Sequence, residues 1–223
     1  MCLPRTALSG PSKAPSATQG LATGDLSLDG IVLWSRTDQL ADFVSEWSTH
    51  EDFRYTQSCP RVTAHGGEDF TIKFGLTGLP TNADIYVRGH FRSLATGRTS
   101  EQLKCRFRTP AKSATRPLRF AWSGDLAGQG FGINPDIGGY RLLKTVADAQ
   151  PDLFINCGDV IYADTPLRES KKVAGGRTWR NLVTNAQREV AQSLEGFRGQ
   201  YRYNYIDENY RRLNSICPHI YSW

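Results

Sequence analysis

The sequence predicts an N-terminal all-β sandwich of the fibronectin type, followed by a partial α/β domain. Two observations predict this division. Between Gly20 and Pro110, short runs of alternating apolar residues are separated by polar turns, a pattern typical of antiparallel strands. From Leu118 onward, two apolar runs flank a segment with helical spacing, which is typical of a β-α-β unit with parallel strands.

At least four strands are predicted in the first region. Turns containing Asp-Gly, Pro-Thr-Asn or Thr-Gly precede or separate them. In one run every second residue from Phe70 to Leu76 is apolar, so those residues share one face of a strand. The predicted strands cover residues 30–36, 70–76, 83–91 and 103–109.

Changes in composition divide the chain into four parts. The first residues are rich in Pro, Ser, Ala and Gly, which predicts a flexible leader. The segment TPAKSATRP between the two patterned regions has the composition of a linker. The predicted boundaries are 1–19 for the leader, 20–110 for the sandwich, 111–117 for the linker and 118–223 for the α/β part.

The α/β part begins with two apolar runs, residues 118–123 and 153–157, each predicted to be a buried strand. Residues 140–149 lie between them with apolar positions at helical spacing. Further along, Val190, Leu194 and Phe197 are spaced as one face of an amphipathic helix. Residues 216–223 then begin like a third strand, from which we expect the chain to stop before the α/β domain is complete.

Composition and charge exclude several classes of protein. The net charge is +5, and the basic residues are spread over both halves of the chain, so no nucleic-acid partner is expected. No apolar stretch is long enough to span a membrane, and the first twenty residues have no signal-peptide pattern. The five cysteines include no C-x-x-C pair, which argues against a zinc ribbon or a redox motif.

Two acidic residues occupy equivalent places in the predicted β-α-β unit. Gly124-Asp125 follows the first strand and Gly158-Asp159 the second. The carboxyl ends of parallel strands meet at one edge of a sheet, so both carboxylates are expected there, and a cation would relieve their repulsion. Tyr162 lies three residues further on, where a turn could bring its phenol oxygen to the same cation. A Gly-Asp pair after a strand is also an ordinary turn and helix cap, so the residues alone leave both interpretations open.

Three segments in order resemble the PhoD-like alkaline phosphatases and phosphodiesterases of the calcineurin-like metallophosphoesterase superfamily. They are GLATGDLSLDGIVLWSRTD at residues 20–38, DLFINCGDVIYAD at residues 152–164, and FRGQYRYNYIDENYRRLNSICPHIYSW at residues 197–223. The last is similar to the segment that precedes the family's W-D-D-H-E motif. Three ordered blocks are far more specific than any single motif.

The resemblance implies hydrolysis of phosphate mono- or diesters with two metals, Fe with Ca or a combination of Mn, Zn and Mg. It implies that Asp159 bridges the metals, that Tyr162 binds the iron-like one, and that Asp125 replaces a cysteine ligand of many family members. It also implies an exported protein. Because the family's His and Asn ligands and leaving-group donors would lie beyond residue 223, we expect this chain alone to be inactive. The alternative is a non-catalytic binding or adhesion module built on the sandwich.

Overall fold

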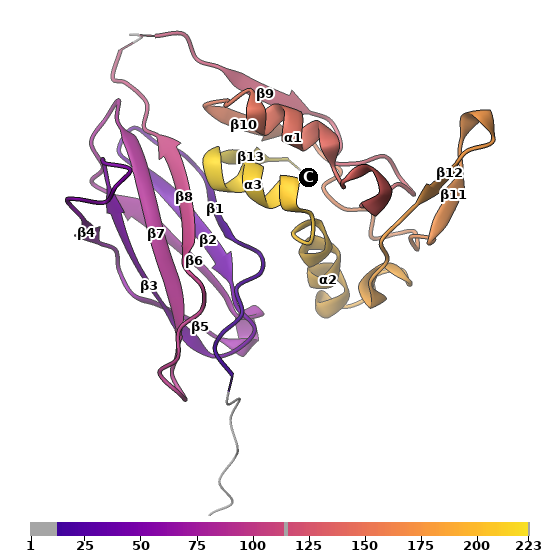
Figure 1. Cartoon of the computed structure of the whole chain (residues 1–223), viewed down its shortest axis with the longest axis horizontal. Coiled ribbons are helices and arrows are strands. Elements are labelled where there is room, and N and C mark those ends of the chain that lie inside the picture. The colour runs from indigo at the N-terminus through magenta and orange to yellow at the C-terminus, as the bar shows by residue number, and fades with distance from the viewer. Residues whose placement is uncertain (1–12, 114–115, 223) are drawn as a thin grey trace, which may run out of the picture.

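The computed structural model describes residues 13–113 and 116–222. Figure 1 shows two parts, a two-layered β-sandwich and a mixed region of helices and parallel strands. The yellow helix α3 (Glu208–Ile216) lies between them and contacts strands β1 and β8 of the sandwich. No helix within the described ranges is long and apolar enough to cross a membrane.

The sandwich consists of two antiparallel layers that confirm the predicted strands. The first layer is formed by β1 (Leu21–Gly24), β2 (Gly30–Arg36) and β6 (Thr71–Thr77), in the order β6-β2-β1. The second has the order β4-β3-β7-β8, with β5 also paired to β3; its strands are β3 (Ala41–Ser48), β4 (Gln57–Ser58), β5 (Val62–Ala64), β7 (Asp84–Ser93) and β8 (Leu103–Arg108).

Alternating side chains from both layers fill the core of the sandwich. Phe43 is fully buried, and its ring lies 4.9 Å from that of Phe91 and 6.4 Å from that of Phe74, measured between centroids. The Phe43 ring occupies the space over Gly89, where an added Cβ would come within 2.6 Å of it. This packing explains why strand β7 carries a glycine in its middle, where glycine otherwise weakens a strand.

The second region contains the predicted parallel unit. Strands β9 (Phe120–Ser123) and β10 (Leu153–Asn156) are parallel neighbours, joined through α1 (Arg141–Asp148). Strand β13 (His219–Tyr221) pairs in parallel with β10 on its other side. It also pairs with β1 through Gly24 and His219, so one six-stranded sheet of order β6-β2-β1-β13-β10-β9 runs through both regions.

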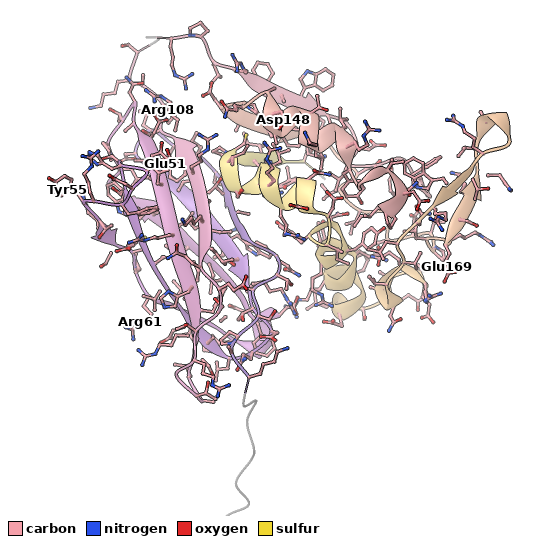
Figure 2. The ribbon with its side chains drawn as sticks, in the orientation of Figure 1. Glu51, Tyr55, Arg61, Arg108, Asp148 and Glu169 are labelled. Atoms are coloured by element: carbon pink, nitrogen blue, oxygen red, sulfur yellow. The ribbon has the colours of Figure 1, made fainter. Side chains whose placement is uncertain are left out.

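Helices α1 and α3 cover one face of the parallel strands. Phe154 of β10 is buried there in a cluster that includes Leu143 of α1 and Leu213 of α3. Figure 2 shows Asp148 at the end of α1 near α3, and its carboxylate lies 2.7 Å from the Arg212 guanidinium. The remaining elements are helix α2 (Leu194–Asn204), the hairpin of β11 (Ser170–Lys172) with β12 (Thr178–Arg180), and four short 3-10 turns, η1 (Gly66–Glu68), η2 (Pro135–Ile137), η3 (Ala174–Gly176) and η4 (Asn185–Gln187).

Two predictions about burial are wrong. The run 118–123 is not a buried strand: β9 is the edge strand of its sheet, and Trp122 is 68% exposed. Val190, Leu194 and Phe197 do not form a buried helix face, because all three are exposed. The buried face of α2 is more polar and consists of Gly199, Gln200, Tyr203 and Asn204.

Only part of the predicted leader lies within the described residues, because residues 1–12 fall outside them. From Lys13 the chain is hydrogen-bonded to the sandwich: the Ser16 amide donates to Asp38 at 2.8 Å, and Gln39 donates to the Lys13 carbonyl at 3.1 Å. The predicted linker includes residues 114–115, which the structure does not describe. The cysteines of the described part, Cys59, Cys105, Cys157 and Cys217, are all free thiols.

Candidate functional site

The carboxyl ends of β9 and β10 form the edge of the sheet to which the sequence assigns the two acidic residues. Ser123 and Asn156, the last residues of these strands, are register partners. Two backbone hydrogen bonds continue the pairing past the strands, from the Cys157 amide to the Ser123 carbonyl at 2.8 Å and from the Leu126 amide to the Asp159 carbonyl at 3.2 Å. The segments that carry Asp125 and Asp159 therefore run side by side.

The three predicted site residues come together at this edge. Tyr162 donates its phenol proton to the Asp125 carboxylate at 2.6 Å. That hydrogen bond, partial burial and the charges of Asp125 and Asp159 all raise the pKa of Tyr162 above its ordinary value. Both carboxylates are exposed to solvent, whereas Tyr162 is half-buried.

The turn after β10 has an unusual backbone that directs Asp159. Gly158 has a φ of 151° and Asp159 a φ of 44°, both on the positive side that most side chains avoid. Asp is among the few residues that tolerate this conformation. Asn156 stabilises the turn by accepting a hydrogen bond from the Gly158 amide at 3.1 Å. The Gly-Asp pair is therefore required here as a turn, and the same turn places the carboxylate beside Tyr162.

Helix α2 supports this turn from behind, a role that the sequence did not reveal. The Asn204 side chain is buried and donates to the Val160 carbonyl at 2.9 Å, one residue past Asp159. The Tyr140 hydroxyl donates to the side-chain oxygen of Asn204 at 3.1 Å. Asp159 and Tyr162 line a small cavity of about 50 Å³ together with Asn204 and Tyr140. An Asn at the end of a polar helix gives no recognisable signal, so only the structure identifies it as a support.

The donor set at this edge suits a hard metal ion. Two carboxylates and one phenol supply three oxygen donors, the kind that Mg²⁺, Ca²⁺, Mn²⁺ and Fe³⁺ prefer. Among residues 13–113 and 116–222, no group of three or more His, Cys, Asp or Glu side chains lies close enough to hold a metal. A site here thus depends on the tyrosine oxygen, and the metal-ligand role of Asp125, Asp159 and Tyr162 stays a prediction.

Family comparisons match both regions of the chain. The family model described as "PhoD-like phosphatase" matches residues 120–223, and that described as "PhoD-like phosphatase, N-terminal domain" matches residues 4–111. The two matches follow one another in the order of the two structural regions. The chain belongs to the PhoD-like phosphatase family. A search of curated proteins finds no match to this chain.

Solved structures share the fold of this PhoD-like chain. The structure of PhoD has a TM-score of 0.74 at 23% identity, covering 96% of this chain and 40% of that one. A purple acid phosphatase from yellow lupin (Lupinus luteus) seeds has a TM-score of 0.55 at 15% identity, covering 94% of this chain and 35% of that one. This chain thus spans less than half the length of either relative, while 96% of it is covered by the match to PhoD.

Proposed function

We propose that this PhoD-like chain contributes the first ligands of a metal-dependent hydrolase of phosphate mono- or diesters. The observation that carries the proposal is the contact of Tyr162 with Asp125 beside Asp159, at the carboxyl ends of two adjacent parallel strands. Membership of the phosphatase family supports the reaction class. An exported protein, as in the resemblance, is part of the same proposal.

Each of the three side chains has a distinct task in the proposed site. In the proposed site Asp159, on its positive-φ turn, would be a ligand to both cations, and Asp125 and Tyr162 would help to hold one of them. A bound metal would supply Lewis-acid activation of a phosphate ester. Tyr162 donates its proton to Asp125, so its oxygen could serve as a metal ligand only after that proton had been lost to solvent. Asn204 would hold the turn in place.

Metal binding by the purified chain tests the proposal directly. We expect Fe³⁺, Mn²⁺ or Ca²⁺ to bind saturably and Asp159→Asn to weaken binding by at least about tenfold, since a carboxylate ligand is lost. Asp164→Asn is the matched control, because Asp164 is exposed, lies five residues further on and loses the same charge. Calorimetry and elemental analysis of dialysed protein provide the two measurements.

The result also separates the proposal from its rival. Equal metal content in the wild type, Asp159→Asn and Asp164→Asn would contradict it and favour the non-catalytic binding module. For the activity itself, we expect a longer version that continues beyond residue 223 to hydrolyse p-nitrophenyl phosphate, and the present chain to remain inactive. Metal-dependent turnover by the present chain would show that the catalytic machinery needs nothing further.

A further inference from the structure

We propose that the groove between the sandwich and helix α2 is a second ligand site, which takes a phosphate ester carrying an aromatic ring, of nucleotide size. The groove, called here the interface groove, has a volume of about 430 Å³. That volume lies within the range of small-molecule sites. Its walls are the outer faces of β2 and β6 on one side and residues of α2 on the other, as the lining residues Trp34, Lys73 and Arg198 show.

Positive charge in the interface groove exceeds what its carboxylates neutralise. Asp69 accepts from Arg36 at 2.7 Å with one oxygen and from Arg202 at 2.7 Å with the other. Among the described residues, neither Lys73 nor Arg198 has a carboxylate partner; Arg198 donates to the Gly67 carbonyl at 3.1 Å. These two cations come from opposite walls of the groove, and both favour an anionic ligand there.

Two buried polar atoms in the groove lack a partner. The Gln19 side chain is 9% exposed, and its carbonyl oxygen has no hydrogen bond within the described part of the chain. The Nε of Arg36 is likewise buried and without a partner there. Leaving such atoms unpaired is costly, but both are closed off from solvent, so neither can reach a ligand in the groove, and the ligand must be recognised by the exposed groups of the lining.

Aromatic rings provide the rest of the surface. Trp34 stacks on Tyr205 with ring centroids 4.8 Å apart, and Tyr201, also in the lining, is 37% exposed. Exposed aromatic faces beside cations favour planar rings through stacking. Glu68 lies exposed in the lining and disfavours a purely anionic ligand.

The chemistry of the ligand follows from these groups. Lys73 and Arg198 offer donors for the oxygens of a phosphate, and the exposed Tyr201 ring favours a planar ring. Adenosine monophosphate combines a phosphate with a planar ring and is therefore the probe we choose.

Calorimetric titration of the whole chain in EDTA tests the proposal, since the chelator removes metal binding at Asp159 from the measurement. We expect saturable one-to-one binding of adenosine monophosphate, and weaker binding of adenosine or inorganic phosphate alone. The double variant Lys73→Ala/Arg198→Ala should weaken binding at least about tenfold, because two charge-assisted contacts are lost. Lys104→Ala/Lys112→Ala is the matched control, with the same loss of charge at two exposed positions elsewhere.

A second variant addresses the aromatic contact. Tyr201→Ala should weaken adenosine monophosphate binding several-fold, because the exposed ring of the lining is lost. Absence of saturable binding at millimolar adenosine monophosphate overturns the proposal. So does equal binding by the wild type and the folded Lys73→Ala/Arg198→Ala variant, with circular dichroism as the check on folding.

Discussion

The two sheets of the sandwich and the parallel strands that follow use similar apolar runs in different surroundings. In the sandwich, every inward side chain meets one from the opposite layer, so Phe43 is completely buried. The parallel strands have helices on one face only. On the other face the apolar side chains are exposed or half-buried; they are Phe120, Trp122, Leu153, Ile155 and Ile220.

The difference teaches that an apolar run predicts a strand but not what covers it. Alternation in the sandwich identifies its buried face, since each strand has one face in water. The runs of β9 and β10 are apolar on both faces, so the sequence alone predicts that both faces are buried. The parallel region is held by α1, α3 and its contacts with the sandwich, of which the Asp69 ion pairs and the β1–β13 bridge are specific examples.

The largest effect is expected in the core of the sandwich. Phe43→Ala should lower the free energy of unfolding by about 3–5 kcal/mol, because it removes a buried ring and leaves a cavity between Phe74 and Phe91. Phe120→Ala is the matched control, since Phe120 is 54% exposed on β9. Urea unfolding of both variants provides the comparison. Equal losses would mean that the sandwich and the parallel strands do not differ in the way described.

An intermediate effect is expected where the two regions meet. Asp69→Asn should lower the free energy of unfolding by about 1–3 kcal/mol, because two largely buried guanidinium groups lose their common carboxylate. The matched control is Asp84→Asn, whose ion pair with Arg108 is more exposed and joins two strands of the same layer. If both substitutions lower the free energy of unfolding equally, the contact between the two regions stabilises the fold no more than an ion pair within one layer.

The same contact predicts a dependence on pH. Burial acts to raise the pKa of Asp69, but hydrogen bonds from Arg36 and Arg202 outweigh it, so the pKa lies below its usual value. The carboxylate therefore stabilises the fold fully above the ordinary Asp pKa of about 3.9, and this stability is lost as the pH falls through the lowered value. Unfolding measured between neutral pH and strongly acidic pH should show a smaller decline for Asp69→Asn than for the wild type. Parallel declines would assign the acid sensitivity to other groups.

The sandwich and the parallel unit were predicted because apolar residues recur at regular spacing in both. Strand β2 was predicted to the residue, and α1 to within one residue at either end. Strand β3 was not predicted, although Ala41, Phe43 and Trp47 point inward, because a polar Ser at inward position 45 and an apolar Val at outward position 44 interrupt the alternation.

At the candidate site, the repeated Gly-Asp pair predicted two side chains, and the position of Tyr162 three residues past Asp159 predicted the third, in agreement with the family resemblance. No sequence pattern identifies the residues that support them, because Asn204 and Tyr140 act through contacts with residues far away in the chain. Helix α2 is a second case in which the sequence pattern did not identify the buried residues. Its buried face is polar because it holds loops rather than a core, and apolar spacing therefore indicated the exposed face instead.

The smallest effect on stability is expected on the exposed face of the parallel strands. Trp122→Ser removes a side chain that is 68% exposed at the sheet edge, so the free energy of unfolding should change by no more than about 0.5 kcal/mol. Binding of an apolar fluorescent dye such as anilinonaphthalene sulfonate should nevertheless fall, because the exposed apolar surface shrinks. Leu40→Ser, an exposed apolar residue on the sandwich, is the control and should leave dye binding unchanged. A large loss of stability in Trp122→Ser would instead mean that this face is covered in solution, and the contrast between the sandwich and the parallel strands would then disappear.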